Sequence, residues 1–236
     1  MVINRLRTHL EEPQDVAGLA MFRVLFGLLM VASVIRFWAN GWIESIYLDP
    51  SFHFTYLGFE WLTVPSAFVL KSIFALMLLS AAALTCGFYT RWSASLFFLT
   101  FTYVELLEKA AYLNHYYLVS LLSFLLILVP THGAYSYDAI VRGGRGKCIR
   151  GHYLLFRAQV GLVYFFAGYG KLNQDWLFDA QPLRIWMGAK TDFPWIGDYL
   201  GEPWLAYGMC WFGTIFDLTI PIWLSMKRTR LPAYIL

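Results

Sequence analysis

The sequence predicts an all-α integral membrane protein, a polytopic bundle of about six transmembrane helices in a single transmembrane domain over residues 1–236. Hydrophobic residues make up 59% of the chain and charged residues 14%, whereas average soluble domains carry about 25% charged residues. The mean hydropathy is +0.55. Aromatic residues reach 19%, which is typical of proteins with two membrane–water interfaces, where amphipathic rings accumulate.

Apolar stretches near the roughly 20 residues that a transmembrane helix needs define the bundle. They are residues 16–38, 67–89, 92–109, 115–131, 152–171 and 203–225. The third and fourth are short. The N-terminal segment before the first stretch is too polar for a signal peptide, so we expect that stretch to remain as a membrane anchor.

Basic residues orient the bundle. The segments after the fourth and sixth stretches carry Arg142, Arg145, Lys147, Arg150, Lys227, Arg228 and Arg230. The positive-inside rule places both segments in the cytoplasm, together with the N-terminus and Arg91. Residues 39–66 then lie outside, and they contain no Lys or Arg. The residues expected at one exoplasmic level are Glu108, Lys109, Asn114, His115, Lys171, Asp175 and Trp176.

Ionisable residues inside apolar stretches usually face the bundle interior or a wet cavity. We interpret Arg23 and Asp217 as structural residues satisfied by internal Arg–carboxylate pairing, and count Arg157 among the structural polar residues. For Glu108 and Lys109, internal pairing and a role beside the candidate site are equally supported interpretations.

Lys171 and His115 are the candidates for chemistry. On position alone, Lys171 is best explained as a lysine that reaches to the interface or neutralises a helix C-terminus. The functional alternative is a lysine in apolar surroundings whose neutral amine acts as a base. His115 is either a polar interfacial residue or a proton-handling group aimed into a cavity.

Charge and cysteine content exclude several classes of function. A formal net charge of +3 does not indicate a nucleic-acid partner. The three cysteines form no CxxC pair and predict neither a disulfide framework nor a zinc site. We see no metal-ligand cluster among the five His and three Cys, so no metal is expected.

Two motifs in this order resemble a known family. The most specific is AGYGKLNQDW, which contains Lys171, and the second is the Asn-His pair of YLNHYYL. Further similarity lies in FRVLFGLLM and FHFTYLGFEWL and fades after FDL, so that it runs from Phe22 to Asp217. The chain is similar to the membrane portion of vitamin K-dependent gamma-glutamyl carboxylases and their bacterial relatives, which share the horizontally transferred transmembrane domain.

The resemblance implies a chemistry. In that family a lysine deprotonates vitamin K hydroquinone, and oxygen converts the quinol into a strong base that removes a γ-proton from a peptide glutamate. The carbanion adds carbon dioxide, and the quinone leaves as its epoxide. By position, Lys171 matches the base and His115 the histidine that shapes the glutamate site. The substrate-binding residues would be Asn114, Tyr112, Asp175 and Trp176. The implied cofactor is reduced vitamin K, a menaquinol or phylloquinol, with O2 and CO2 as co-substrates.

The implied partners are the lipid bilayer, a quinol from the membrane and an exoplasmic peptide or protein glutamate. Animal members have a second lysine where this sequence has Gly170. The chain stops at LPAYIL, which resembles the opening of a seventh apolar helix, so we expect the family's C-terminal helices and exoplasmic domain to be absent. Without those helices an apolar face of the bundle would be exposed, and lipid, a partner or a second copy of the chain would cover it. An oligomer is therefore compatible with the sequence.

Three hypotheses follow from the sequence. The first is a quinol-dependent glutamate carboxylase, and the second is related quinol-driven chemistry on another substrate. The third is a quinone- or lipid-binding membrane module without carboxylase activity. A transporter is disfavoured because neither paired broken helices nor an internal repeat is visible. Cysteine scarcity and length favour a bacterial inner membrane over the endoplasmic reticulum, with the active site exoplasmic.

Overall fold

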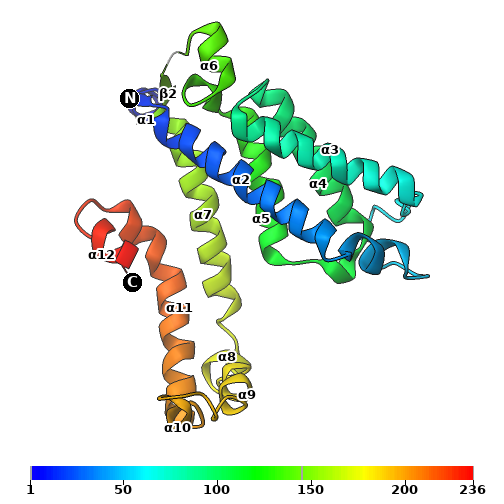
Figure 1. Cartoon of the computed structure of the whole chain (residues 1–236). Helices are drawn as coiled ribbons and strands as arrows, with labels where there is room; N and C mark the ends of the chain where they lie inside the picture. Colours follow the sequence, from blue (N-terminus) through cyan, green and yellow to red (C-terminus); the bar gives the residue numbers. More distant parts are fainter. Residues whose placement is uncertain (1, 145, 236) are drawn as a thin grey trace. The chain divides into compact units, whose positions relative to one another are not determined.

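The chain folds into two compact units, Met1–Phe156 and Arg157–Leu236. The structure, a computed structural model, describes residues 2–144 and 146–235 (Figure 1). Arg145, one of the residues used to orient the bundle, lies outside the described residues. The division between the units falls within one helix, α7 (Arg150–Gly170). A single transmembrane domain over residues 1–236 stays a prediction.

The first unit is built around four helices that pack in chain order, α2 against α3, α3 against α4 and α4 against α5 (Figure 1). Its helices are α1 (Val2–Leu10), α2 (Ala17–Ala39), α3 (Ala67–Cys86), α4 (Thr90–Leu107), α5 (Asn114–Leu128) and α6 (Tyr137–Arg142). Short helical turns are η1 (Glu44–Leu48), η2 (Lys109–Ala111) and η3 (Thr131–Gly133). The strands β1 (Pro13–Asp15) and β2 (Lys147–Ile149) pair antiparallel, with Gln14 opposite Cys148.

The core of the first unit is mostly aliphatic, and aromatic pairs join its helices. The ring of Phe26 meets that of Phe97 edge-on at 6.0 Å, and the ring of Phe37 stacks on Phe74 at 5.4 Å. A Cβ added to Gly27 of α2 would lie 2.3 Å from the Oγ1 atom of Thr85 on α3. A small residue therefore lets these two helices approach closely, as is common between transmembrane helices.

The distribution of polar and apolar residues on α2 is the reverse of that on a surface helix of a soluble protein. Arg23 is fully buried, whereas Leu25 and Leu29 are 59% and 63% exposed. In a soluble protein an arginine is almost never fully buried. Apolar residues outside and an ionisable residue inside are the arrangement expected of a helix that faces lipid.

The second unit is centred on α11 (Pro203–Ser225). Three short helices, α8 (Gln174–Leu177), α9 (Leu183–Gly188) and α10 (Gly197–Leu200), contact its N-terminal part, and α12 (Arg230–Ile235) follows it. Aromatic side chains tie this region together, because the Nε1 atom of Trp211 donates to the Leu177 carbonyl at 3.0 Å and the hydroxyl of Tyr207 to the Phe178 carbonyl at 2.7 Å.

Each of the six predicted apolar stretches is helical, and the fold is mostly helical apart from the short β1–β2 pair, which is consistent with the predicted all-α class. Among the described residues, three helices are long and apolar enough to cross a membrane: α2, α3 and α11. They are consistent with a multi-pass membrane protein. The helix α5 is a shorter apolar helix, and α4 and α7 carry charged and hydroxyl residues along their length. Six membrane spans therefore stay a prediction, as does the orientation.

Candidate functional site

Lys171 follows directly on the last residue of α7 and lies beside α11. Its backbone N–H donates to the Gly168 carbonyl at 3.1 Å, which closes the last turn of the helix. Its ammonium group forms a hydrogen-bonded ion pair with the Oδ2 atom of Asp217 on α11. The side chains of Lys171 and Asp217 are 24% and 13% exposed. The amine is therefore partly buried but still accessible from outside the protein.

Trp176 forms the third part of this cluster. The Nζ atom of Lys171 lies 5.4 Å from the centroid of the Trp176 ring, within the range of a cation–π contact. The indole Nε1 atom donates to the Cys210 carbonyl of α11 at 2.9 Å, which fixes the ring. Asn173 caps α8, since its Oδ1 atom accepts from the Trp176 backbone N–H at 2.9 Å. We call Lys171, Asp217 and Trp176 the lysine cluster.

Gly168 explains how α7 and α11 come close enough for the ion pair. A Cβ added to this buried glycine would lie 2.7 Å from Cγ of Leu218 and 3.0 Å from its backbone nitrogen. Leu218 follows Asp217 in sequence, so the close approach occurs at the level of the carboxylate. Nothing lies within 4 Å of a Cβ added to Gly170, whose position is therefore open.

The other residues predicted for the site are exposed. Asp175 has an exposed side chain, and its carbonyl accepts from the Gln181 N–H at 2.8 Å. Asn114 and His115 open α5, and the His115 ring contacts that of Tyr116 at 4.6 Å. Tyr112 is 43% exposed. These three residues belong to the first unit and the lysine cluster to the second, so their convergence at one membrane level stays a prediction.

Comparison with known families gives a match over nearly the whole chain. Residues 11–236 match the HTTM domain. The chain belongs to the HTTM family. This confirms the predicted family, because the HTTM domain is found in vitamin K-dependent gamma-glutamyl carboxylases. No solved structure matches the chain.

Arg23 has a structural role in this HTTM chain, but the predicted carboxylate partner is wrong. Its guanidinium donates to the Thr131 carbonyl at 3.0 Å and to the Tyr135 carbonyl. Two carbonyl oxygens from the segment after α5 thus take the place of a carboxylate. The internal pair expected for Asp217 is present, with Lys171 as the partner rather than an arginine. Arg157 lies on α7 and is exposed.

Glu108 holds the loop that precedes α3 in the HTTM chain in place. It is 7% exposed, and its carboxylate accepts from the Ala110 N–H at 2.7 Å and the Phe54 N–H at 3.3 Å. Lys109 donates its backbone N–H to the Phe54 carbonyl at 2.8 Å, and its Nζ atom lies 6.0 Å from the Tyr56 ring centroid. Both residues therefore fix residues 54–56 against the end of α4.

Gly168 and Asn173 are site residues that sequence reasoning missed. The sequence did hold a signal for each. A glycine on the last turn of an apolar helix often marks a close helix contact. An asparagine placed directly before a short helical segment is a typical N-cap.

Proposed function

We propose that this chain carries out vitamin K hydroquinone-dependent carboxylation of peptide glutamate to γ-carboxyglutamate, coupled to epoxidation of the quinol. The observation that carries the proposal is the lysine cluster, which gives Lys171 of the AGYGKLNQDW motif a carboxylate partner and an aromatic neighbour. Membership of the HTTM family supports the same assignment. Lys171 acts as the base on the quinol.

The residues around Lys171 fit a quinol. The amine is partly exposed and stands beside the Trp176 ring, while Tyr169 and Leu172 present 62% and 51% of their surface. An apolar ring system suits these faces, and its hydroxyl suits the amine. A bound quinol supplies the basicity that no side chain has near neutral pH, because O2 oxidises it to the epoxide and its second oxygen atom leaves as water.

The chain's own residues handle protons and position the substrates. For Lys171 to act as the base, its ammonium first passes one proton to the Asp217 carboxylate, and the neutral amine then takes the proton of the quinol hydroxyl. On the peptide, the γ C–H bond breaks and its electron pair forms the new bond to CO2. We assign His115, Asn114 and Tyr112 to the glutamate, because they are exposed at the start of α5. The quinol enters from the bilayer and the peptide from the exoplasmic side.

The test is a coupled assay on the full chain purified in detergent. Reduced vitamin K, air, labelled bicarbonate and a glutamate-containing peptide are supplied, and epoxide and fixed label are measured together. Lys171→Ala is expected to lose both products. Lys190→Ala, which removes an exposed lysine of the same unit, should keep both. Asp217→Asn is expected to lower both rates and to shift their pH profile.

Each outcome distinguishes a hypothesis. Epoxide without fixed label would mean quinol-driven chemistry on another substrate. Neither product from the folded wild-type chain would refute catalysis, and quinone binding that survives Lys171→Ala would then identify a binding module. Both products in Lys171→Ala would refute the role of the lysine.

A further inference from the structure

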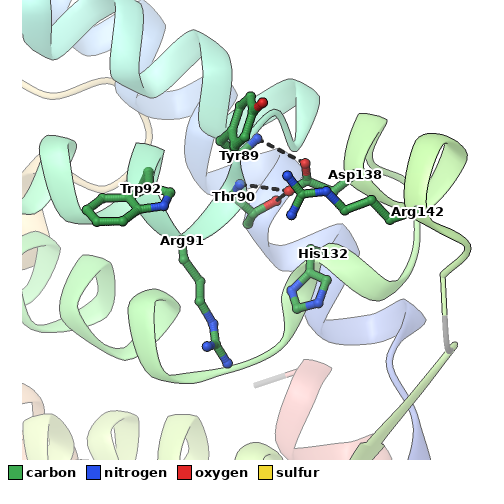
Figure 2. Close-up of a pocket in the computed structure, with 7 residues that line it drawn as sticks. All are labelled: Tyr89, Thr90, Arg91, Trp92, His132, Asp138 and Arg142. Atoms are coloured by element: carbon green, nitrogen blue, oxygen red, sulfur yellow. Dashed lines mark hydrogen bonds between the residues drawn. The ribbon is translucent and has the colours of Figure 1, made fainter.

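A cationic hollow lies in the first unit, between the start of α4 and the segment that follows α5. It has a volume of about 380 Å³. Arg91, His132 and Arg142 line it, together with the aromatic side chains of Tyr89 and Trp92 (Figure 2). We call this the arginine hollow. It lies entirely within the first unit, and the carboxylase proposal does not use it.

The positive charges of the arginine hollow are only partly balanced by a nearby carboxylate, since the charge of Arg142 helps to lower the pKa of Asp138. Within residues 2–144 and 146–235, neither Arg91 nor Arg142 lies in an ion pair. The guanidinium of Arg142 instead lies over the Tyr89 ring, 5.2 Å from its centroid. Burial, and then the charge of Arg91, lower the pKa of His132. The charge of Arg91 adds to the larger effect of burial, because a nearby positive charge disfavours the protonated imidazole.

The one carboxylate that lines the hollow is committed elsewhere. Asp138 accepts from the Thr90 N–H at 2.8 Å, the Thr90 hydroxyl at 2.9 Å and the Tyr89 N–H at 3.1 Å (Figure 2). Burial alone would raise the pKa of Asp138, but these hydrogen bonds, together with the positive charge of Arg142, bring it below its usual value. Its negative charge therefore caps the start of α4.

One wall of the hollow, the segment that carries His132, is held by internal hydrogen bonds. Arg23, fully buried, holds the carbonyls on either side of His132, those of Thr131 and Tyr135. The Ser136 hydroxyl donates to the His132 carbonyl at 2.5 Å. This wall therefore needs little rearrangement when an anion binds, which reduces the entropic cost of binding.

The rim indicates the source of the anion. Trp92 and Tyr89, which line the hollow, are 77% and 48% exposed. Exposed aromatic side chains next to arginines are typical of the level of lipid headgroups. The predicted orientation puts this end at the cytoplasmic leaflet, which carries anionic lipids. We propose that the arginine hollow binds the phosphate of an anionic membrane phospholipid through Arg91 and Arg142.

The test measures lipid binding to the full chain in detergent as the rise in unfolding temperature on titration with phosphatidylglycerol. Phosphatidylcholine and inorganic phosphate at constant ionic strength are the parallel titrations. Arg91→Gln with Arg142→Gln is expected to weaken phosphatidylglycerol binding about a hundredfold, or about tenfold for each charge-assisted contact. The matched control, Lys147→Gln with Arg228→Gln, removes two exposed charges outside the hollow and should change the affinity less than twofold.

The arms separate the alternatives. Equal losses in the two double variants would overturn the proposal in favour of diffuse surface charge. Equal stabilisation by phosphatidylcholine would overturn the requirement for an anionic lipid, and equal stabilisation by inorganic phosphate would overturn the lipid source. Arg91→Lys with Arg142→Lys, which keeps the charge, guards against a folding defect and should lose less than tenfold.

Discussion

Gly87 gives the sharpest test of how the first unit is assembled. It ends α3 with φ +65°, a left-handed conformation that costs a residue with a Cβ about 1 kcal/mol. A Cβ added there would also lie 2.2 Å from Cβ of Ser136, 2.8 Å from its Cα and 2.7 Å from a nitrogen of Arg23. The Gly87 carbonyl accepts from the Asp138 N–H at 3.1 Å, so retreat would break a hydrogen bond.

Gly41 provides a matched control. It has φ +67°, but nothing lies within 4 Å of an added Cβ. Gly87→Ala and Gly41→Ala therefore carry the same energetic cost for the left-handed backbone, but only Gly87→Ala adds a steric clash between the new Cβ and neighbouring atoms. Overpacking of this kind costs typically 1–3 kcal/mol. Taking about 2 kcal/mol, and about 2–4 °C per kcal/mol for a chain of this size, we expect Gly87→Ala to unfold about 4–8 °C below Gly41→Ala.

The assay is thermal unfolding of both variants in the same detergent. A second measurement identifies the partner: Ser136→Gly removes the nearest atom, so the double variant Gly87→Ala with Ser136→Gly should be more stable than the two single losses predict. Equal unfolding temperatures for Gly87→Ala and Gly41→Ala, or strict additivity in the cycle, would refute the contact between the α3–α4 turn and the segment after α5.

Three further predictions concern side chains. Glu108→Ala leaves the N–H groups of Phe54 and Ala110 without their acceptor and should cost about 1–3 kcal/mol; Glu60→Ala, at an exposed site, should cost less in the same thermal unfolding. Because the pKa of His132 is lowered in the folded chain, the imidazole is protonated at a higher pH in the unfolded chain than in the folded one. Stability should therefore be full above about pH 6.5 and decline below it, and less steeply in His132→Gln when unfolding is followed from pH 7.5 to 5.5. Trp176→Phe keeps a ring but loses the donor to Cys210, so it should lower stability by about 1 kcal/mol, whereas Trp186→Phe, at an exposed position, should change the unfolding temperature little.

The positions of the long helices could be predicted because hydropathy alone defines them. The exact ends could not, since they depend on local hydrogen bonds. The third stretch was predicted to run to residue 109, but α4 stops at Leu107 because Glu108 turns its carboxylate onto Ala110 and Phe54. The second was predicted to reach residue 89, but Gly87 ends α3 in a left-handed conformation.

Partners that lie far apart in sequence were beyond prediction. The sequence indicates that a buried arginine must be satisfied, yet the carbonyls that bind Arg23 lie 108 and 112 residues away. Hydropathy says nothing of which backbone carbonyls a fold leaves open. The short helix α8 was missed for a related reason, because aromatic donors of α11 bind the carbonyls at its end.

The partner of Lys171 changes how the proposed base should be understood. A lysine considered alone needs only apolar surroundings to offer a neutral amine, and Asp217 would then be an unrelated structural residue. In the lysine cluster the two groups form one hydrogen-bonded pair, so a proton arriving from a quinol is received by the pair. Gly168 belongs to the same unit of function, because without its close approach to Leu218 the carboxylate could not reach the amine. The AGYGK segment and the FDL segment therefore act together: one brings the amine, the other the carboxylate, and the glycine sets the distance between their helices.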